Sequence, residues 1–223
     1  MGLISILFSD PVIFILIVVS LVFALCIHEF SHGYIAYLNG DDTAYRMGRL
    51  TLNPLKHLDP IGSMMILFIG FGYAKPVPVN PANLNNPRKD MIKVAAAGPI
   101  SNFILSFLGV LILTAIHELG MLQKNYQTFF SYFIIINTYL GLFNLIPIYP
   151  LDGGQIFGNI ISKYNRNIFI KLNEYGPKIL LGVILLSFIT QGRISILGWI
   201  IETPATLIVD GFHIIAKKIL FFL

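Results

Sequence analysis

Charged residues are scarce in this chain, and cysteine is almost absent. Only 12% of the 223 residues are charged and 56% are hydrophobic, whereas a soluble domain carries about 25% charged residues. The shortage of charge excludes an ordinary soluble domain and predicts an integral membrane protein. The single cysteine, Cys26, excludes an internal disulfide and, inside an apolar run, is interpreted as a packing residue.

The chain also lacks long polar linkers, low-complexity tails and internal repeats. No stretch between the apolar segments is long enough for a soluble domain, so we interpret residues 1–223 as one membrane domain. Its core is expected over residues 11–165, with further membrane segments over residues 178–222. The first apolar segment lacks a basic n-region and a cleavage site, so we do not expect a removable signal peptide.

Five apolar segments approach the length of about 20 residues that a helix needs to cross a bilayer. They cover residues 11–38, 92–116, 129–149, 178–191 (extending towards 200) and 203–222. A sixth segment, 61–74, has 14 residues, which is short for a crossing and favours a re-entrant or core segment. This pattern predicts an all-α polytopic membrane protein with five to six transmembrane segments.

Two stretches beside the short segment have the character of strands. Residues 48–52 alternate partly between polar and apolar side chains and are followed by Asn53-Pro54. Residues 73–79 contain Pro76 and Pro78, which restrict them to an edge strand or an extended loop. We therefore expect a small re-entrant β segment next to the helices.

The basic residues lie between the apolar segments, where they report topology. If 61–74 returns to the side from which it enters, 13 of the 15 Lys and Arg residues share one side, and only Lys124 and Arg193 lie on the other. Basic residues accumulate in the cytoplasm, which places residues 39–93, 150–178 and the C-terminus there and the N-terminus outside. We expect a multi-pass protein of the cell membrane and, despite the net charge of +4, no nucleic-acid partner.

The first apolar segment contains the pattern H-E-x-x-H, formed by His28, Glu29 and His32. On a helix the two imidazoles lie four residues apart on one face, which suits zinc, and the glutamate beside them suits a general base. A lone histidine in an apolar helix is usually a packing residue. Three ionisable groups in a membrane segment are costly and normally mark function, so we predict a zinc site and hydrolysis inside the membrane.

A catalytic zinc ion takes three protein ligands and one water molecule, and Asp152 is the candidate for the third ligand. It follows an almost uncharged span in which Pro147 and Pro150 break the helix, and Gly153-Gly154 allow a sharp turn. On position alone, Asp152 fits the N-cap of the next helix equally well. Asp152 and the two histidines are expected at the cytoplasmic ends of their helices, and this shared depth favours the ligand role.

Four further polar residues lie in or beside the membrane segments. Asn102 and Asn137 lie where lipid would penalise an unpaired amide, and for Asn137 an interhelical hydrogen bond is the favoured interpretation. Asn144 lies in the span that leads to Asp152. Two roles stay open for it: an interhelical hydrogen bond, or support of the metal site or of the oxyanion. His57 borders segment 61–74 and is a weaker candidate for lining the site, with a structural role preferred.

Taken together, these residues make the sequence similar to the site-2 protease family of intramembrane zinc metalloproteases. The similarity extends over residues 20–165 and rests on the segments 28–32, 48–60, 98–102 and 144–154. It implies that His28, His32 and Asp152 bind one zinc ion per chain, and that Glu29 is the general base. It also implies a re-entrant β segment bordering the site and cleavage of single-pass transmembrane substrates.

The chain departs from the family in two ways. Tyr149-Pro150 stands where members often have Asn-Pro, and no PDZ or CBS domain fits in the sequence, so it resembles the minimal prokaryotic branch. Two other functions stay open on the residues alone, a membrane metal-ion transporter and a non-proteolytic scaffold that binds transmembrane helices. We expect membrane lipid and a single-pass substrate as partners, and the sequence does not indicate an oligomeric state.

Overall fold

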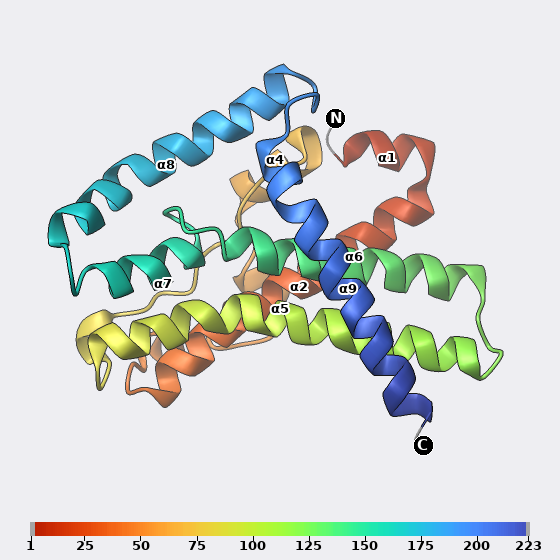
Figure 1. Cartoon of the computed structure of the whole chain (residues 1–223), viewed down its shortest axis with the longest axis horizontal. Coiled ribbons are helices and arrows are strands. Elements are labelled where there is room, and N and C mark those ends of the chain that lie inside the picture. The colour runs from red at the N-terminus through yellow and green to blue at the C-terminus, as the bar shows by residue number, and fades with distance from the viewer. Residues whose placement is uncertain (1–2, 222–223) are drawn as a thin grey trace.

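The computed structural model describes residues 3–221, and this part of the chain is helical (Figure 1). Four of the described helices are long and apolar enough to cross a membrane. They are α2 (Pro11–Leu38), α5 (Pro87–Glu118), α8 (Arg166–Ile189) and α9 (Ile196–Phe221). The prediction of an all-α polytopic membrane protein is confirmed. The expected number of five to six spans is not, because the described residues contain four candidate spans.

Shorter elements connect and cover the long helices. They are α1 (Ile4–Ser9), α3 (Thr43–Arg46), α4 (Pro60–Ile69), α6 (Lys124–Asn144), α7 (Asp152–Ile161) and two 3₁₀ turns, Pro54–Lys56 and Pro81–Asn83. The sequence predicts a membrane span at 129–149, and α6 occupies most of it. Buried polar side chains such as Asn137 and Thr138, both 0% exposed, make α6 less apolar than the four candidate spans.

Local signals set the ends of the helices. Asp10 caps α2 by accepting a hydrogen bond from the Ile13 amide (3.0 Å), and Pro11 occupies the first helical position. In the same way Asp59 caps α4 by accepting from the Gly62 amide (2.9 Å). The helix α4 ends at Gly70, whose φ of 83° is the left-handed conformation that glycine adopts readily.

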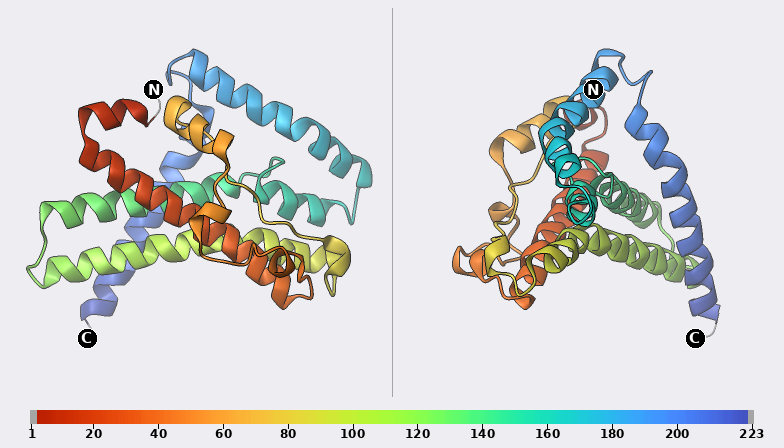
Figure 2. Two further views of the ribbon diagram at one scale, coloured as in Figure 1. Left: turned by 180° about the vertical axis from the view of Figure 1, so that it is seen from behind. Right: turned by 60° about the vertical axis from the view of Figure 1, so that its left-hand side comes forward.

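Three helices form the centre of the bundle (Figures 1 and 2). The helices α5 and α6 run antiparallel, joined by the turn at 119–123, and α2 packs against both. The helix α9 crosses α5 and α6 obliquely, and α8 contacts α7 and α9. The end of α2 lies beside the start of α5, since the Lys93 ammonium donates to Asn39 and the Asn85 amide donates to the Asn39 carbonyl.

The expected β segment is not formed in residues 3–221. Residues 48–52 contain no strand, and residues 71–80, which we call the strap, run as an extended loop with one isolated bridge between Leu58 and Ala74. Pro76 and Pro78 have no amide hydrogen, so the strap cannot build a continuous ladder. The buried Arg49 guanidinium instead donates to the carbonyls of Lys75 (2.8 Å) and Pro76 (3.2 Å).

The chain doubles back between α4 and the strap. A Cβ atom built on Gly62 would lie 2.0 Å from the carbonyl oxygen of Tyr73, so only glycine permits this approach. One built on Gly72 would lie 2.1 Å from the carbonyl oxygen of Gly62. The ten-residue helix and the returning strap are therefore packed against each other.

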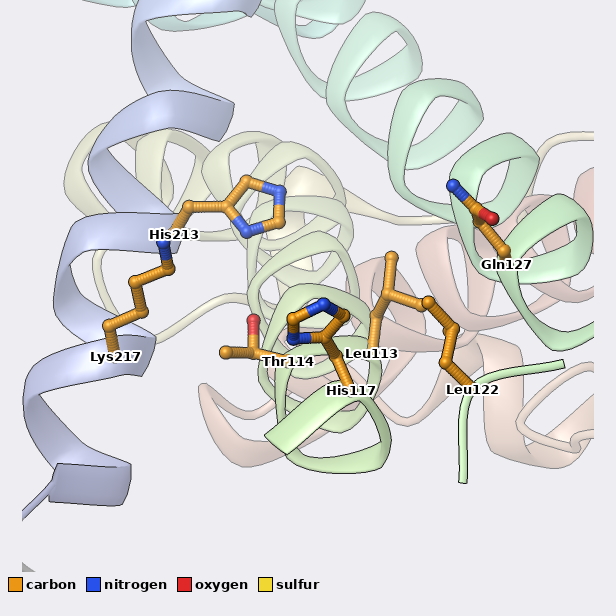
Figure 3. Close-up of a pocket in the computed structure, with 7 residues that line it drawn as sticks. All are labelled: Leu113, Thr114, His117, Leu122, Gln127, His213 and Lys217. Carbon is orange, nitrogen blue, oxygen red and sulfur yellow. The ribbon is translucent and has the colours of Figure 1, made fainter. Parts of the chain in front are cut away.

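The end of α9 does not lie where the charge pattern led us to expect it, which was on the same side as residues 39–93. Ala216 of α9 packs in a cluster with Val110 of α5 and Ile134 of α6. Figure 3 shows His213 and Lys217 of α9 facing the end of α5, where His117 lies. The end of α9 therefore lies beside the α5–α6 turn, away from residues 39–93. The expectation assumed that apolar segments alternate across the membrane, whereas α9 crosses α5 and brings its last turns to the α5–α6 turn.

Candidate metal centre

Two histidines and one aspartate converge inside the bundle. His28 and His32, one turn apart on α2, are 4% and 9% exposed, and Asp152 is the first residue of α7. The Nε2 atoms of His28 and His32 lie 3.2 and 3.4 Å from Oδ2 of Asp152. The three possible ligand atoms lie within 4.8 Å of one another, close enough for one metal ion to contact all three.

The glycine pair after Asp152 positions this carboxylate. A Cβ atom on Gly153 would lie 2.2 Å from the Leu145 carbonyl oxygen, and one on Gly154 would lie 2.5 Å from the Tyr149 amide nitrogen. Only glycines allow α7 to pack this closely on the loop that follows α6. The alternative role of Asp152 as an N-cap is not observed, because Leu151 occupies that position and the buried Oδ2 atom has no hydrogen-bond partner.

Hydrogen bonds fix the tautomer of both imidazoles in their neutral, metal-binding form. Nδ1 of His28 lies 2.6 Å from Oδ1 of Asn102, and Nδ1 of His32 lies 2.7 Å from the Val94 carbonyl oxygen. Both partners are acceptors, so Nδ1 carries the hydrogen and Nε2 presents a lone pair. In this neutral form, two lone pairs face a carboxylate oxygen in a buried site. A cation relieves this repulsion, and imidazole nitrogen and carboxylate oxygen are donors that zinc accepts.

The wall opposite the histidines is the backbone of α5 at Gly98. A Cβ atom built there would lie 2.5 Å from Nε2 of His32 and 2.6 Å from Nε2 of His28. Zinc binds imidazole nitrogen at about 2.0–2.1 Å, so an alanine side chain would compete for the space in front of these nitrogens. The small residue therefore keeps the metal position open.

The side-chain amides of Asn137 and Asn102 form a buried hydrogen-bonded chain that ends at Nδ1 of His28. Asn102, on α5, donates through Nδ2 to Oδ1 of Asn137 (3.1 Å) and to the Ala24 carbonyl (3.3 Å). Asn137 in turn donates to the Phe133 carbonyl (2.9 Å), and both asparagines are 0% exposed. The predicted interhelical bond of Asn137 is confirmed. The contact of Asn102 with His28 was not predicted from the sequence, although a polar residue one turn after Gly98 in an apolar helix was the available signal.

Glu29 faces the strap rather than the three possible ligands. Its Oε2 accepts a hydrogen bond from the Val77 amide (2.8 Å), and its side chain is buried. Pro76 and Pro78 have no amide hydrogen, so Val77 is the sole backbone donor among residues 76–78. With Arg49 holding the carbonyls just before Val77, the strap fixes the position of this carboxylate.

The far end of the strap is anchored at Asp41. This buried carboxylate accepts hydrogen bonds from the Asn80 amide (2.7 Å), the Asn83 side chain (3.0 Å) and Thr43. Burial alone would raise the pKa of Asp41, but these hydrogen bonds outweigh it and hold the pKa below its usual value. Asp41 is therefore ionised at neutral pH and ties the strap to the turn after α2.

The structure does not bring Asn144 or His57 into the three-residue cluster. Asn144 is half-buried at the end of α6 and donates through Nδ2 to the Leu140 carbonyl of its own helix (3.0 Å). His57 is 1% exposed, and its Nε2 donates to the Thr51 carbonyl (2.7 Å) while its own carbonyl accepts from the Lys75 amide. His57 thus holds the loop before α4 against the strap.

Comparisons with known proteins point to zinc metalloproteases. The pattern of peptidase family M50 matches residues 14–124 and 114–187. Two relatives bear the name "Putative zinc metalloprotease", YwhC of Bacillus subtilis (strain 168) and Rip2 of Mycolicibacterium smegmatis. YwhC is 43% identical over 72% of this chain and 75% of its own length. Rip2 is 24% identical over 85% of this chain and 74% of its own length.

A third relative is archaeal. Zinc metalloprotease MJ0392 of Methanocaldococcus jannaschii is 28% identical over 83% of this chain, and the match covers 45% of its length. The chain therefore spans less than half of that protein. No solved structure gives a significant match to the chain.

Proposed function

The chain belongs to peptidase family M50, a family of zinc metalloproteases, and on that premise we propose that it cleaves single-pass membrane proteins within or near their membrane segments. The observation that carries this proposal is the buried cluster of His28, His32 and Asp152. Two of its members lie on α2, which is apolar enough to cross a membrane. A peptide bond hydrolysed at this cluster must enter the helical bundle, which favours substrates that are themselves in the membrane.

We assign the zinc ligands to Nε2 of His28, Nε2 of His32 and Oδ2 of Asp152. When bound there, zinc supplies a Lewis acid that polarises a peptide carbonyl and lowers the pKa of water towards about 7. The hydrogen bonds of Asn102 and Val94 to the two Nδ1 atoms keep both Nε2 lone pairs directed at the metal position.

Glu29 is the proposed general base. It follows His28 on α2, so it lies about 100° around the helix from that ligand and stays outside the ligand set. Its carboxylate takes the proton of the attacking water and delivers it to the leaving amine. The Val77 amide holds Oε2, which leaves the other carboxylate oxygen to receive the proton.

The substrate must expose its carbonyls before it can be cut, because a helix hides them in intrahelical hydrogen bonds. We propose that an unwound stretch binds in extended form beside residues 48–52 or the strap, by pairing with their free backbone groups. Asn144 has a second amide hydrogen and is the proposed support for the oxyanion. For His57 we propose only a structural role.

Purified protein in sealed lipid vesicles, together with a single-pass substrate, tests the function. We expect product peptides whose new ends, read by mass spectrometry, lie within or near the membrane segment, and no zinc entry into the vesicles. Zinc entry without cleavage would support a metal transporter instead. Substrate that binds but stays intact would support a scaffold.

We also propose that the protein lies in the cell membrane with its N-terminus outside and residues 39–93 and 150–178 in the cytoplasm, so the site opens towards the cytoplasm. Single cysteines at positions 42, 85, 121 and 165, in a Cys26→Ser background, test this in intact cells. We expect an impermeant thiol reagent to label position 121 only. Labelling at 85 would show that segment 61–74 crosses the membrane.

The C-terminal helix gives a further check on topology. Because Lys217 lies beside the α5–α6 turn, a cysteine at position 218 should be labelled together with the one at 121. Labelling at 121 but not at 218 would contradict the position of the end of α9 beside the α5–α6 turn.

The role of Asn102 predicts a contrast between two substitutions of similar size. Asn102→Leu removes the acceptor for Nδ1 of His28, and zinc affinity should fall by about 10–100-fold. Asn102→Asp keeps an acceptor, and its affinity should stay near the wild-type value. Zinc affinity is measured by competition with a chelator in detergent. Equal affinity for both variants would show that this hydrogen bond does not set the metal site.

A further inference from the structure

A second site lies at the end of the bundle where α5 begins and α7 leads into α8. A cavity of about 510 Å³ opens there between these three helices. We propose that it binds a phosphate group, carried by a lipid headgroup or free in solution. The proposal is independent of the hydrolytic chemistry, since none of His28, Glu29, His32 or Asp152 lines the cavity.

Two arginines from separate helices line this cavity. Arg88 lies in the first turn of α5, and Arg166 is the first residue of α8. Within residues 3–221 neither guanidinium forms an ion pair or a side-chain hydrogen bond, and no carboxylate lines the cavity. Two uncompensated guanidiniums around one space favour an anion, and planar guanidinium groups pair with phosphate oxygens in a bidentate manner.

Neutral groups complete the lining. Gln155 on α7 has a side-chain amide free of hydrogen bonds in the described part of the chain, so it can donate to a bound oxyanion. Met91, Tyr149 and Phe169 supply apolar surface next to these polar groups. An anionic head beside apolar surface, at the end of a membrane bundle, is the environment that a phospholipid headgroup requires.

The cavity also touches the helix that carries a proposed zinc ligand. Gln155 lies one turn after Asp152 on α7, and the cavity wall includes Asn159 and Ser162 of the same helix. A phosphate held by Arg88 and Arg166 would therefore tie α7 to α5 and α8. We expect occupancy to stabilise the folded protein as well as to bind measurably.

The experiment uses the full chain in neutral detergent, delipidated, with two probes. Inorganic phosphate is compared with chloride at equal ionic strength, and short-chain phosphatidylglycerol is compared with a neutral glycolipid of the same chain length. Binding is followed by native mass spectrometry and by the midpoint of thermal unfolding. The variants are Arg88→Gln, Arg166→Gln and the double variant, and Arg193→Gln, in the α8–α9 turn outside the cavity, is the matched control.

We expect wild type and Arg193→Gln to retain phosphatidylglycerol, and the double variant to bind it at least about tenfold more weakly. Phosphatidylglycerol binding without phosphate binding assigns the site to a lipid headgroup, whereas binding of both assigns it to the phosphate group itself. Equal binding by wild type and the double variant, or no binding of either probe to wild type, would overturn the proposal. Unchanged zinc content in every variant verifies that the fold is intact.

Discussion

Replacing Glu29 by glutamine should abolish most of the proteolysis while zinc stays bound. Glutamine keeps the size of the side chain and can still accept the Val77 amide hydrogen, but it cannot take a proton from water. Loss of a positioned general base lowers the rate by about 10²–10⁴-fold, which corresponds to roughly 3–5 kcal/mol of barrier. Zinc content, bound substrate and cleavage are measured in one preparation, in which we expect substrate to accumulate uncut.

The matched control for this substitution is Glu202→Gln, which makes the same chemical change at an exposed residue of α9 and should leave cleavage unchanged. Near wild-type cleavage by Glu29→Gln with zinc retained would refute the proposed mechanism. Loss of zinc would instead show that Glu29 helps to hold the metal, and its role would have to be reassigned.

Asp152→Ala should remove zinc and activity together. Asp152 supplies the only carboxylate of the three-residue cluster, and its loss leaves two imidazoles to hold the ion. Because the loss of a partner that merely orients a ligand weakens metal binding by about 10–100-fold, the loss of the ligand itself should cost more. Metal analysis after dialysis against a weak chelator measures the effect.

Two further variants sharpen that test. His28→Ala should lose zinc to a similar extent, whereas Asp210→Ala, which removes a carboxylate from α9 outside the cluster, should retain one zinc ion per chain. Full zinc content and activity in Asp152→Ala would show that the third ligand is another residue.

The sequence predicts those parts of the site that follow from local spacing. Two imidazoles four residues apart share a helix face whatever surrounds them, so His28 and His32 were predictable. Asp152 was predictable from the prolines and glycines around it, which break one helix and allow the next to turn inwards. The structure adds the contact of all three and removes the N-cap alternative.

Contacts between distant segments were not predictable in the same way. The hydrogen bond from His32 to the Val94 carbonyl uses a backbone group, which every residue possesses, so no side-chain pattern marks it. The approach of Gly98 to both imidazoles depends on how α5 packs against α2. The link from Glu29 to Val77 likewise depends on where the strap lies.

Two features of the fold differ from the sequence prediction for identifiable reasons. Residues 48–52 and 73–79 have the composition of strands but do not form them. Arg49 donates to the strap carbonyls that a neighbouring strand would otherwise pair with. The side of the bundle at which α9 ends was inferred from the count of membrane crossings. Packing of Ala216 against Val110 and Ile134 determines it instead.

The X-ray absorption spectrum of the purified protein at the zinc edge tests the central claim most directly. We expect two imidazole nitrogens and oxygen neighbours at about 2.0–2.2 Å, with no sulfur at about 2.3 Å. Because His28→Ala should lose the ion, its zinc-edge signal should be largely absent. A sulfur neighbour, or a spectrum that is identical in wild type and His28→Ala, would contradict the assignment of zinc to His28, His32 and Asp152.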